Sequence, residues 1–147
     1  MRLSTRGLYG LYAMVELGLR YGQGPVMLRD IARHQNIPEK YLEQLIRLLR
    51  KARLVRSVRG AHGGYLLARH PKDINLLEVV EALEGPLTLL DCIERPEGCA
   101  RIPFCATHDV WVEVVEALRS RLERWTLADL VARQREKEGI KVWMYHI

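Results

Sequence analysis

The chain has 147 residues, of which 48% are hydrophobic and 28% charged, and this is enough for one globular domain with its own core. No apolar run approaches the roughly 20 residues that cross a bilayer, and the first residues lack the features of a secretory signal, so we expect a cytoplasmic protein without membrane contact. The net charge of +5 is uneven, because residues 1–60 carry twelve Arg or Lys against four Asp or Glu, and residues 61–147 carry eleven against fourteen.

The first predicted element is a helix over residues 5–21, with Ser4 as its N-terminal cap. Apolar side chains recur every three or four residues and predict its buried face: Leu8, Leu11, Tyr12, Val15 and Leu19. The stretch "GQGP" ends this helix. A short helix over residues 28–35 follows, and we expect Ile31 and Ala32 to point inward.

The next predicted helix, over residues 39–53, has the clearest pattern in the first half of the chain. Its apolar side consists of Tyr41, Leu42, Leu45, Leu48, Leu49 and Ala52. Its outward side consists of Glu43, Gln44, Arg47, Arg50 and Lys51. Two helices joined by a tight turn are typical of a helix-turn-helix.

A basic hairpin is predicted after this helix. The β-prone runs "LVRSV" and "YLLA" flank "RGAHGG", whose glycines permit the positive φ angles of a hairpin turn. A helix-turn-helix followed by a basic hairpin predicts a mainly α fold with a small β-hairpin wing. We therefore expect a winged helix-turn-helix domain over residues 1–70.

In such a domain the second helix enters the major groove, so the basic first part of the chain predicts double-stranded DNA as its partner. The candidate DNA-binding residues are Arg2, Ser4, Arg6, Lys40, Glu43, Gln44, Arg47, Arg50, Lys51, Arg56, Arg59 and His62. Gln44 and Arg47 carry the groups that pair with adenine and guanine edges, and Glu43 can accept from cytosine. The alternatives are a supporting ion pair between Glu43 and Arg47, and arginines that are merely solvated.

The remainder, residues 71–147, is predicted to pack on the first domain. Asn75 is a typical cap for a short helix that Gly85 stops. After a loop over residues 92–108, a helix over about 108–125 carries a wide apolar stripe that needs a partner surface. The stripe, which we expect to form a dimer interface, consists of Val110, Trp111, Val114, Val115, Leu118, Leu122 and Trp125. A last helical piece begins at Thr126, and we expect the apolar ending "KEGIKVWMYHI" to pack on something.

All three cysteines of the chain lie in the loop over residues 92–108, "CIERPEGCARIPFCATH". In a reducing compartment, clustered cysteines indicate metal ligands or redox centres rather than a disulfide framework. Cysteine beside histidine is also a possible nucleophile and base. Because no third orienting group is suggested, we do not expect an enzyme. A pure protein-interaction module leaves the outward charges of the second helix unexplained.

The stretches "MRLSTRGLYGLYAMVELG", "KYLEQLIRLLRKARLVRSVRGAHGGYLLAR" and "CATHDVW", with the three-cysteine loop, carry a resemblance. Over residues 1 to about 130 the chain resembles the Rrf2 family of bacterial winged helix-turn-helix repressors, in particular its iron–sulfur branch, which includes IscR and NsrR. The resemblance implies a homodimer on a pseudo-palindromic operator, with the long helix after the cysteine loop as interface. It also implies that Glu43 and Gln44 read bases while Arg59 acts from the wing.

The resemblance further implies a 2Fe–2S cluster with four ligands: Cys92, Cys99, Cys105 and His108. Thiolates are soft ligands, so a 4Fe–4S cluster, a structural zinc site and a metal-free thiol switch, or inert cysteines, are the alternatives. Six residues separate Cys92 from Cys99 where the resemblance implies five, and Leu8 stands where NsrR-like members carry an aspartate. The resulting hypothesis is a dimeric transcriptional regulator, a repressor, whose operator binding is controlled by a cluster in the loop.

Overall fold

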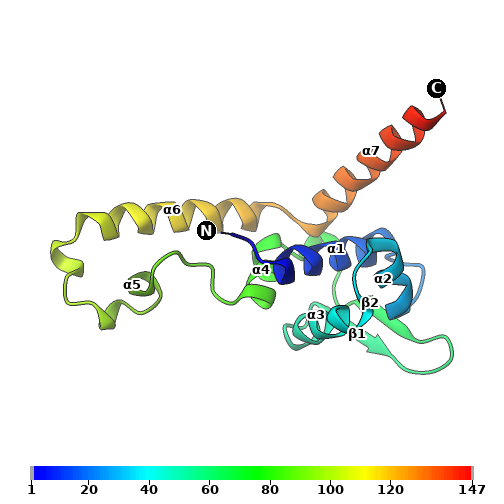
Figure 1. The fold of residues 1–147 in the computed structure, drawn as a ribbon, viewed down its shortest axis with the longest axis horizontal. Coiled ribbons are helices and arrows are strands. Elements are labelled where there is room, and N and C mark those ends of the chain that lie inside the picture. Colours follow the sequence, from blue (N-terminus) through cyan, green and yellow to red (C-terminus); the bar gives the residue numbers. More distant parts are fainter. Residues whose placement is uncertain (1, 147) are drawn as a thin grey trace.

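The computed structural model describes residues 2–146 and is mostly helical, with one two-stranded antiparallel sheet (Figure 1). The α-helices are α1 (Thr5–Leu19), α2 (Leu28–Gln35), α3 (Glu39–Lys51), α4 (Leu76–Glu84), α5 (Asp91–Glu94), α6 (Ala106–Arg124) and α7 (Leu127–Tyr145). The strands are β1 (Val55–Val58) and β2 (Gly64–Leu67), and short 3-10 turns lie at Pro71–Asp73, Pro96–Gly98 and Ile102–Phe104. The predicted fold class, mainly α with a small hairpin, is confirmed.

The core lies around α1, which contacts α2, α3, α4 and α7. Its fully buried side chains come from every part of the chain except the cysteine loop and α6. They include Met14, Ile31, Leu42, Leu45, Leu49, Leu54, Ile74, Val79 and Leu127. Ile31 and Ala32 of α2 are buried as predicted. α4 therefore packs against both α1 and α3, and α7 packs against α1.

The predicted buried face of α1 is partly wrong. Leu8 and Tyr12 are exposed, although both fit the apolar spacing. The helix instead meets α4 through glycines: a Cβ on Gly10 would lie 2.2 Å from the Leu83 side chain. Apolar spacing does not reveal this, because here the contact is made by residues without side chains. The helix also ends at Leu19, two residues earlier than predicted.

The end of α3 also differs from the prediction. The helix stops at Lys51, and Arg53 adopts a positive φ of 61° that turns the chain toward β1. Ala52 is consequently exposed, so its assignment to the apolar side was wrong, whereas Ile46 is buried. The outward assignment of the polar residues of this helix is confirmed.

The hairpin is paired in the register Val55↔Leu67 to Val58↔Gly64. A third segment supports it, because Val26 and Tyr65 exchange backbone hydrogen bonds of 2.9 and 2.8 Å. The wing is therefore tied to the segment that precedes α2.

The predicted boundaries of α4 are confirmed. Asn75 and Glu78 form a reciprocal capping box at its start, and Gly85 ends it with a φ of 88°. A second capping box, between Thr126 and Asp129, starts α7. The outer part of α7 projects from the body of the molecule (Figure 1).

The apolar ending of α7 does not pack on the rest of the chain. Its side chains Ile140, Val142, Trp143, Met144 and Tyr145 are all more than half exposed. The expectation that this ending packs is therefore not met within one chain, and Ile147 lies outside the described residues. Among residues 2–146, no helix is both long and apolar enough to cross a membrane.

Candidate functional site

The outward face of α3 is presented to solvent by the packing of its opposite side. Leu42, Leu45, Ile46 and Leu49 are buried. The predicted DNA-contacting side chains of the helix are all exposed: Lys40, Glu43, Gln44, Arg47, Arg50 and Lys51. Four basic side chains, one amide and one carboxylate thus face solvent. Among the described residues, no ion pair joins Glu43 and Arg47 within 4.0 Å. The interpretation of Glu43 as a helix-supporting partner of Arg47 gains no support.

The wing exposes the remaining basic side chains. Arg56 on β1 and both Arg59 and His62 in the turn are exposed. Gly60 has a φ of 112°, and a Cβ on Gly63 would lie 2.2 Å from the Val58 carbonyl oxygen, so the turn requires glycine at both positions. Figure 1 places α3 and the hairpin together at the lower edge of the molecule.

The N-terminal end of α1 lies next to α3. The hydroxyl oxygens of Thr5 and Tyr41 are 3.3 Å apart. A pocket of about 280 Å³ beside this contact is lined by Arg6 of α1 and by Tyr41, Gln44, Leu45, Arg47 and Leu48 of α3. Arg2 is exposed. Ser4 occupies the N-terminal cap position as predicted, but its hydroxyl makes no hydrogen bond to its own helix; its backbone N–H and its hydroxyl contact Glu84 instead.

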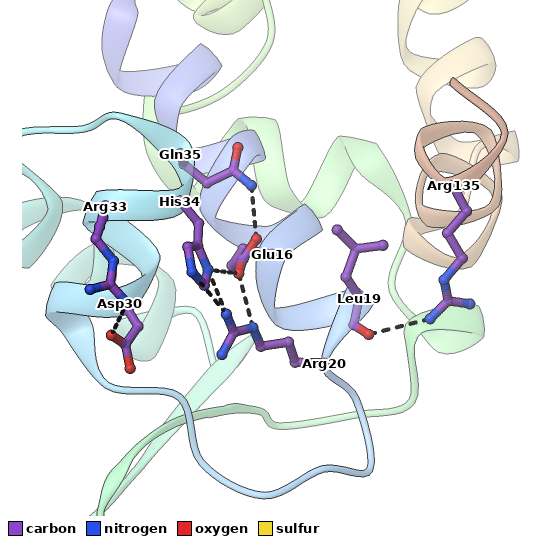
Figure 2. A network of polar contacts seen from close by, with 8 residues as sticks. All are labelled: Glu16, Leu19, Arg20, Asp30, Arg33, His34, Gln35 and Arg135. Atoms are coloured by element: carbon purple, nitrogen blue, oxygen red, sulfur yellow. Dashed lines mark hydrogen bonds and ion pairs between the residues drawn. The ribbon is translucent and has the colours of Figure 1, made fainter. Parts of the chain in front are cut away.

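A buried carboxylate fastens α2 to α1, and sequence reasoning missed it. Figure 2 shows Glu16 of α1 facing His34 and Gln35 of α2. Nδ1 of His34 lies 2.7 Å from Oε1 of Glu16, and Gln35 donates to Oε2 at 2.9 Å. Arg20 lies one turn along α1 and approaches Oε1 at 3.0 Å. The signal in the sequence is a lone acid inside the apolar run "AMVELGL".

The structure places the four predicted ligands in four successive segments of the chain. Cys92 is in α5, Cys99 and Cys105 follow short 3-10 turns, and His108 is in the first turn of α6. Sγ of Cys92 lies 3.3 Å from Nδ1 of His108. Cys92 and Cys99 both line one pocket of about 360 Å³. No disulfide joins the three thiols, all of which are partly buried.

Cys105 faces a different partner. Its Sγ lies 3.1 Å from the hydroxyl of Thr107. This hydrogen bond, and secondly one from the backbone N–H of His108, stabilise the thiolate and lower the pKa of Cys105. Nothing in the described part of the chain forms a group of three Cys, His, Asp or Glu side chains placed to share a metal ion.

The side chains of Cys92, Cys99, Cys105 and His108 are of the types that bind iron–sulfur clusters. Three thiols and an imidazole suit iron–sulfur clusters and zinc alike. The loop already places Cys92 in contact with His108 and on the same pocket as Cys99. For Cys105 to bind the same metal centre, its thiol has to give up the hydrogen bond with Thr107.

The predicted interface stripe on α6 divides into two parts. Val115 is 3% exposed and is used within the chain, where α6 contacts α4. Val110, Val114 and Leu118 are 56%, 37% and 43% exposed. Trp111, Leu122 and Trp125 are half-buried. The open part borders a groove of about 510 Å³ whose lining includes Val114, Ala117 and Leu118.

Known proteins match this chain over most of its length. The family model described as Rrf2, iron-dependent transcriptional regulator, matches residues 3–133. The curated protein rrf2 of Nitratidesulfovibrio vulgaris is 42% identical over 131 residues, which are 89% of this chain and 87% of that protein.

Two solved structures have the same fold and similar sequences. CymR, the global cysteine regulator of B. subtilis, superposes with a TM-score of 0.76 at 38% identity, covering 90% of this chain and 98% of that one. IscR of T. potens superposes with a TM-score of 0.76 at 42% identity, covering 93% and 90%. The chain belongs to the Rrf2 family of transcriptional regulators, with the DNA-binding winged-helix fold of that family.

Proposed function

We propose that this chain is a homodimeric repressor that binds a pseudo-palindromic operator and whose DNA binding is controlled by an iron–sulfur cluster in the loop over residues 92–108. The observation that carries the DNA-binding part is the solvent-facing side of α3, where Glu43, Gln44 and Arg47 are exposed together. These three side chains carry a carboxylate, an amide and a guanidinium, the groups that discriminate base edges in the major groove.

The wing and the flanking basic residues supply the non-specific part of the binding. In the proposed complex Arg59 and His62 enter the groove beside the site that α3 reads, with Arg56 behind them. Lys40 lies at the start of α3, and Arg50 and Lys51 lie at its end. In the proposed complex these three side chains contact DNA phosphates. Arg2 and Ser4 approach the backbone from the start of α1.

The open part of the α6 stripe supports the homodimer. Val110, Val114 and Leu118 form an apolar row on a long helix, with the half-buried Trp111, Leu122 and Trp125 along it. Two such rows, one from each copy, bury one another. A two-fold symmetric dimer matches an operator with two half-sites.

For the loop, we propose a 2Fe–2S cluster bound by Cys92, Cys99, Cys105 and His108, with a 4Fe–4S cluster or zinc as alternative occupants. The support is the contact between Cys92 and His108 and the pocket shared with Cys99. When bound, a cluster supplies a redox-active centre whose loss or oxidation changes the order of the loop. Thr107, which pairs with Cys105 in the structure, has to release that thiol.

A metal-free thiol switch is the second candidate for the loop. The observation that favours it is the lowered pKa of Cys105, a partly buried thiol outside any disulfide. A stabilised thiolate is the reactive form in oxidation and disulfide exchange.

One experiment separates these readings of the loop. Protein purified without oxygen is assayed for iron, zinc and acid-labile sulfide, beside the Cys92→Ala variant and the matched control Ser120→Ala on α6. We expect about two iron and two sulfide per chain, with both lost in Cys92→Ala and retained in Ser120→Ala. One zinc per chain without sulfide would favour the structural zinc site. Protein free of both would favour the thiol switch.

A further inference from the structure

Glu84 is the last residue of α4, and its carboxylate lies against the first turn of α1. Oε1 accepts hydrogen bonds from the backbone N–H groups of Ser4 at 3.1 Å and of Gly7 at 3.0 Å, and the Ser4 hydroxyl contacts the same oxygen. The first N–H groups of a helix have no partner within the helix, and the positive end of the helix favours a carboxylate. Glu84 therefore caps α1 from about 80 residues away.

The turn that Glu84 caps is the part of α1 that adjoins the recognition helix. Thr5 meets Tyr41 of α3, and Arg6 lines the pocket beside Gln44 and Arg47. Arg6 also lies 3.9 Å from Oε2 of Glu84. The position of this turn relative to α3 therefore depends on the carboxylate of Glu84.

The close packing of α1 against α4 leaves little room for the turn to move. A Cβ on Gly7 would lie 2.5 Å from Oε1 of Glu84, and one on Gly10 would lie 2.2 Å from the Leu83 side chain. Both contacts are closer than real Cβ atoms approach, so the two helices meet backbone to side chain. The capping contact is thus part of a fixed interface, with the Glu84 side chain only 22% exposed.

α4 is also held in place by α6 and by the segment that leads to the cysteine loop. Glu81 lies one turn before Glu84, and its Oε2 accepts from Arg119 of α6 at 2.9 Å. The backbone N–H of Leu87, on the way to the cysteine loop, donates to the same oxygen at 3.0 Å. Glu81 and Glu84 are three residues apart on α4. Through them, α4 connects α6 and the segment before the cysteine loop with the first turn of α1.

We propose that Glu84 is a positioning residue for DNA binding, which holds the first turn of α1 where Ser4 and Arg6 reach the DNA backbone beside α3. It touches no DNA itself, because its carboxylate is occupied by the two N–H groups and the hydroxyl. This inference rests on the proposed DNA-binding function.

The test compares Glu84→Ala and Glu84→Gln with the wild-type chain on two duplexes. The first duplex is selected from a random 30-base-pair pool by the wild-type protein, and the second has the same composition in shuffled order. The glutamine amide oxygen can still accept from Ser4 and Gly7, whereas alanine cannot. Asp129→Ala is the matched control, because it removes the carboxylate that accepts from the Thr126 backbone N–H at the start of α7, away from the first turn of α1. Affinities are measured well below the Tm of every variant.

We expect Glu84→Ala to weaken binding of the selected duplex about tenfold or more, because the variant loses the charge-assisted hydrogen bonds that hold the first turn of α1 in place. Binding of the shuffled duplex should change less than about threefold, since the phosphate-attracting charges remain. Glu84→Gln should retain most of the selected-duplex affinity, and Asp129→Ala should match the wild type on both duplexes.

Three results would overturn the inference. The first is that Glu84→Ala binds the selected duplex as tightly as the wild type does. The second is that Glu84→Ala loses affinity equally for both duplexes and Asp129→Ala shows the same losses. The third is that both Glu84 variants bind more tightly than the wild type, which would identify the carboxylate as a competitor of phosphate. If the wild-type chain enriches no duplex at all, the proposed DNA-binding function fails, and that result is distinct from these three.

Discussion

At the scale of single residues, the most informative side chain outside the proposed contacts is Glu16. It is the only charged residue buried in the core of the described chain, at 5% exposure. Its partners Arg20, His34 and Gln35 are partly exposed, so water can hydrogen-bond to them if Glu16 is removed. The buried Glu16 carboxylate, in contrast, depends on these partners for its hydrogen bonds. Burying a carboxylate is costly unless it is hydrogen-bonded, and the hydrogen bonds of this one join α1 to α2.

Replacing Glu16 with alanine should therefore reduce the free energy of unfolding by about 1–3 kcal/mol, because hydrogen bonds to a charged group are lost. Urea denaturation followed by circular dichroism measures this. The matched control is Asp30→Ala, which breaks the Asp30–Arg33 pair at 3.1 Å on the surface of α2. That pair should contribute less than about 0.5 kcal/mol. Equal losses of unfolding free energy in the two variants would mean that the contacts of Glu16 contribute no more than a surface ion pair does.

Cys105 gives a pH dependence whose sign follows from its surroundings. The Thr107 hydroxyl lowers the pKa of this thiol, so its thiolate forms at a lower pH than in an ordinary cysteine. The rate of alkylation by iodoacetamide, which follows the thiolate, should thus reach its half-maximum below the usual pH. Thr107→Val removes the hydroxyl and should move that midpoint upward. Mass spectrometry of the Cys105 peptide from metal-free protein reports the rate, and a midpoint unaffected by Thr107→Val would contradict the assignment.

At the scale of helices and strands, the contact between α1 and α4 determines how the domain is built. The two helices meet at Gly7 and Gly10 rather than at the leucines of the apolar repeat. Because α4 also contacts α3 and α6, it links α3 to the second half of the chain. Its packing is therefore a natural place for a mutation to affect both halves.

Gly10→Ala should destabilise the protein by about 1–3 kcal/mol, because the added methyl group overlaps the Leu83 side chain. Gly139→Ala is the matched control: the glycine is also inside a helix, but nothing lies within 4 Å of its added Cβ. There the substitution should stabilise by up to about 1 kcal/mol through helix propensity. Thermal unfolding of both variants checks the opposite signs, and a neutral Gly10→Ala would refute the close α1–α4 approach.

Local patterns in the sequence predicted the elements themselves well. The glycines of "RGAHGG" gave the wing, and Asn75 with Gly85 gave both ends of α4, because caps and turns depend on neighbouring residues. What could not be predicted joins residues far apart in sequence. Ser4 stands at the predicted cap position of α1, but the side chain that accepts from the N–H groups of Ser4 and Gly7 is that of Glu84, and no local pattern reveals a partner about 80 residues away.

The same limit applies to the candidate site. The outward face of α3 follows from helical spacing, and its exposure is confirmed. The clustering of thiols was visible in the sequence, but the pairing of Cys92 with His108, and of Cys105 with Thr107, depends on the folded path of the loop. Val115 fitted the interface stripe by spacing, yet it is buried within the chain because α4 packs on that side of α6.

At the scale of the whole molecule, the winged domain and the cysteine loop lie apart. Figure 1 shows α6 and the loop extending to one side while α3 and the hairpin form the lower edge of the other. The loop is thus outside the proposed DNA contact, and the regulation proposed here would have to pass through α6, α4 and the proposed second copy. A ligand in the loop shifts DNA affinity only as far as it favours one arrangement of these helices over another.

The most direct test of this account is the dissociation constant for the selected duplex, measured by fluorescence anisotropy without oxygen at fixed salt. Protein carrying the proposed cluster is compared with the same preparation after chelation of its iron. The account predicts affinities that differ by at least about fivefold, the lower range of coupling between two sites. Equal affinities of the two forms would contradict it, as would a protein that binds the duplex but takes up no iron or sulfide.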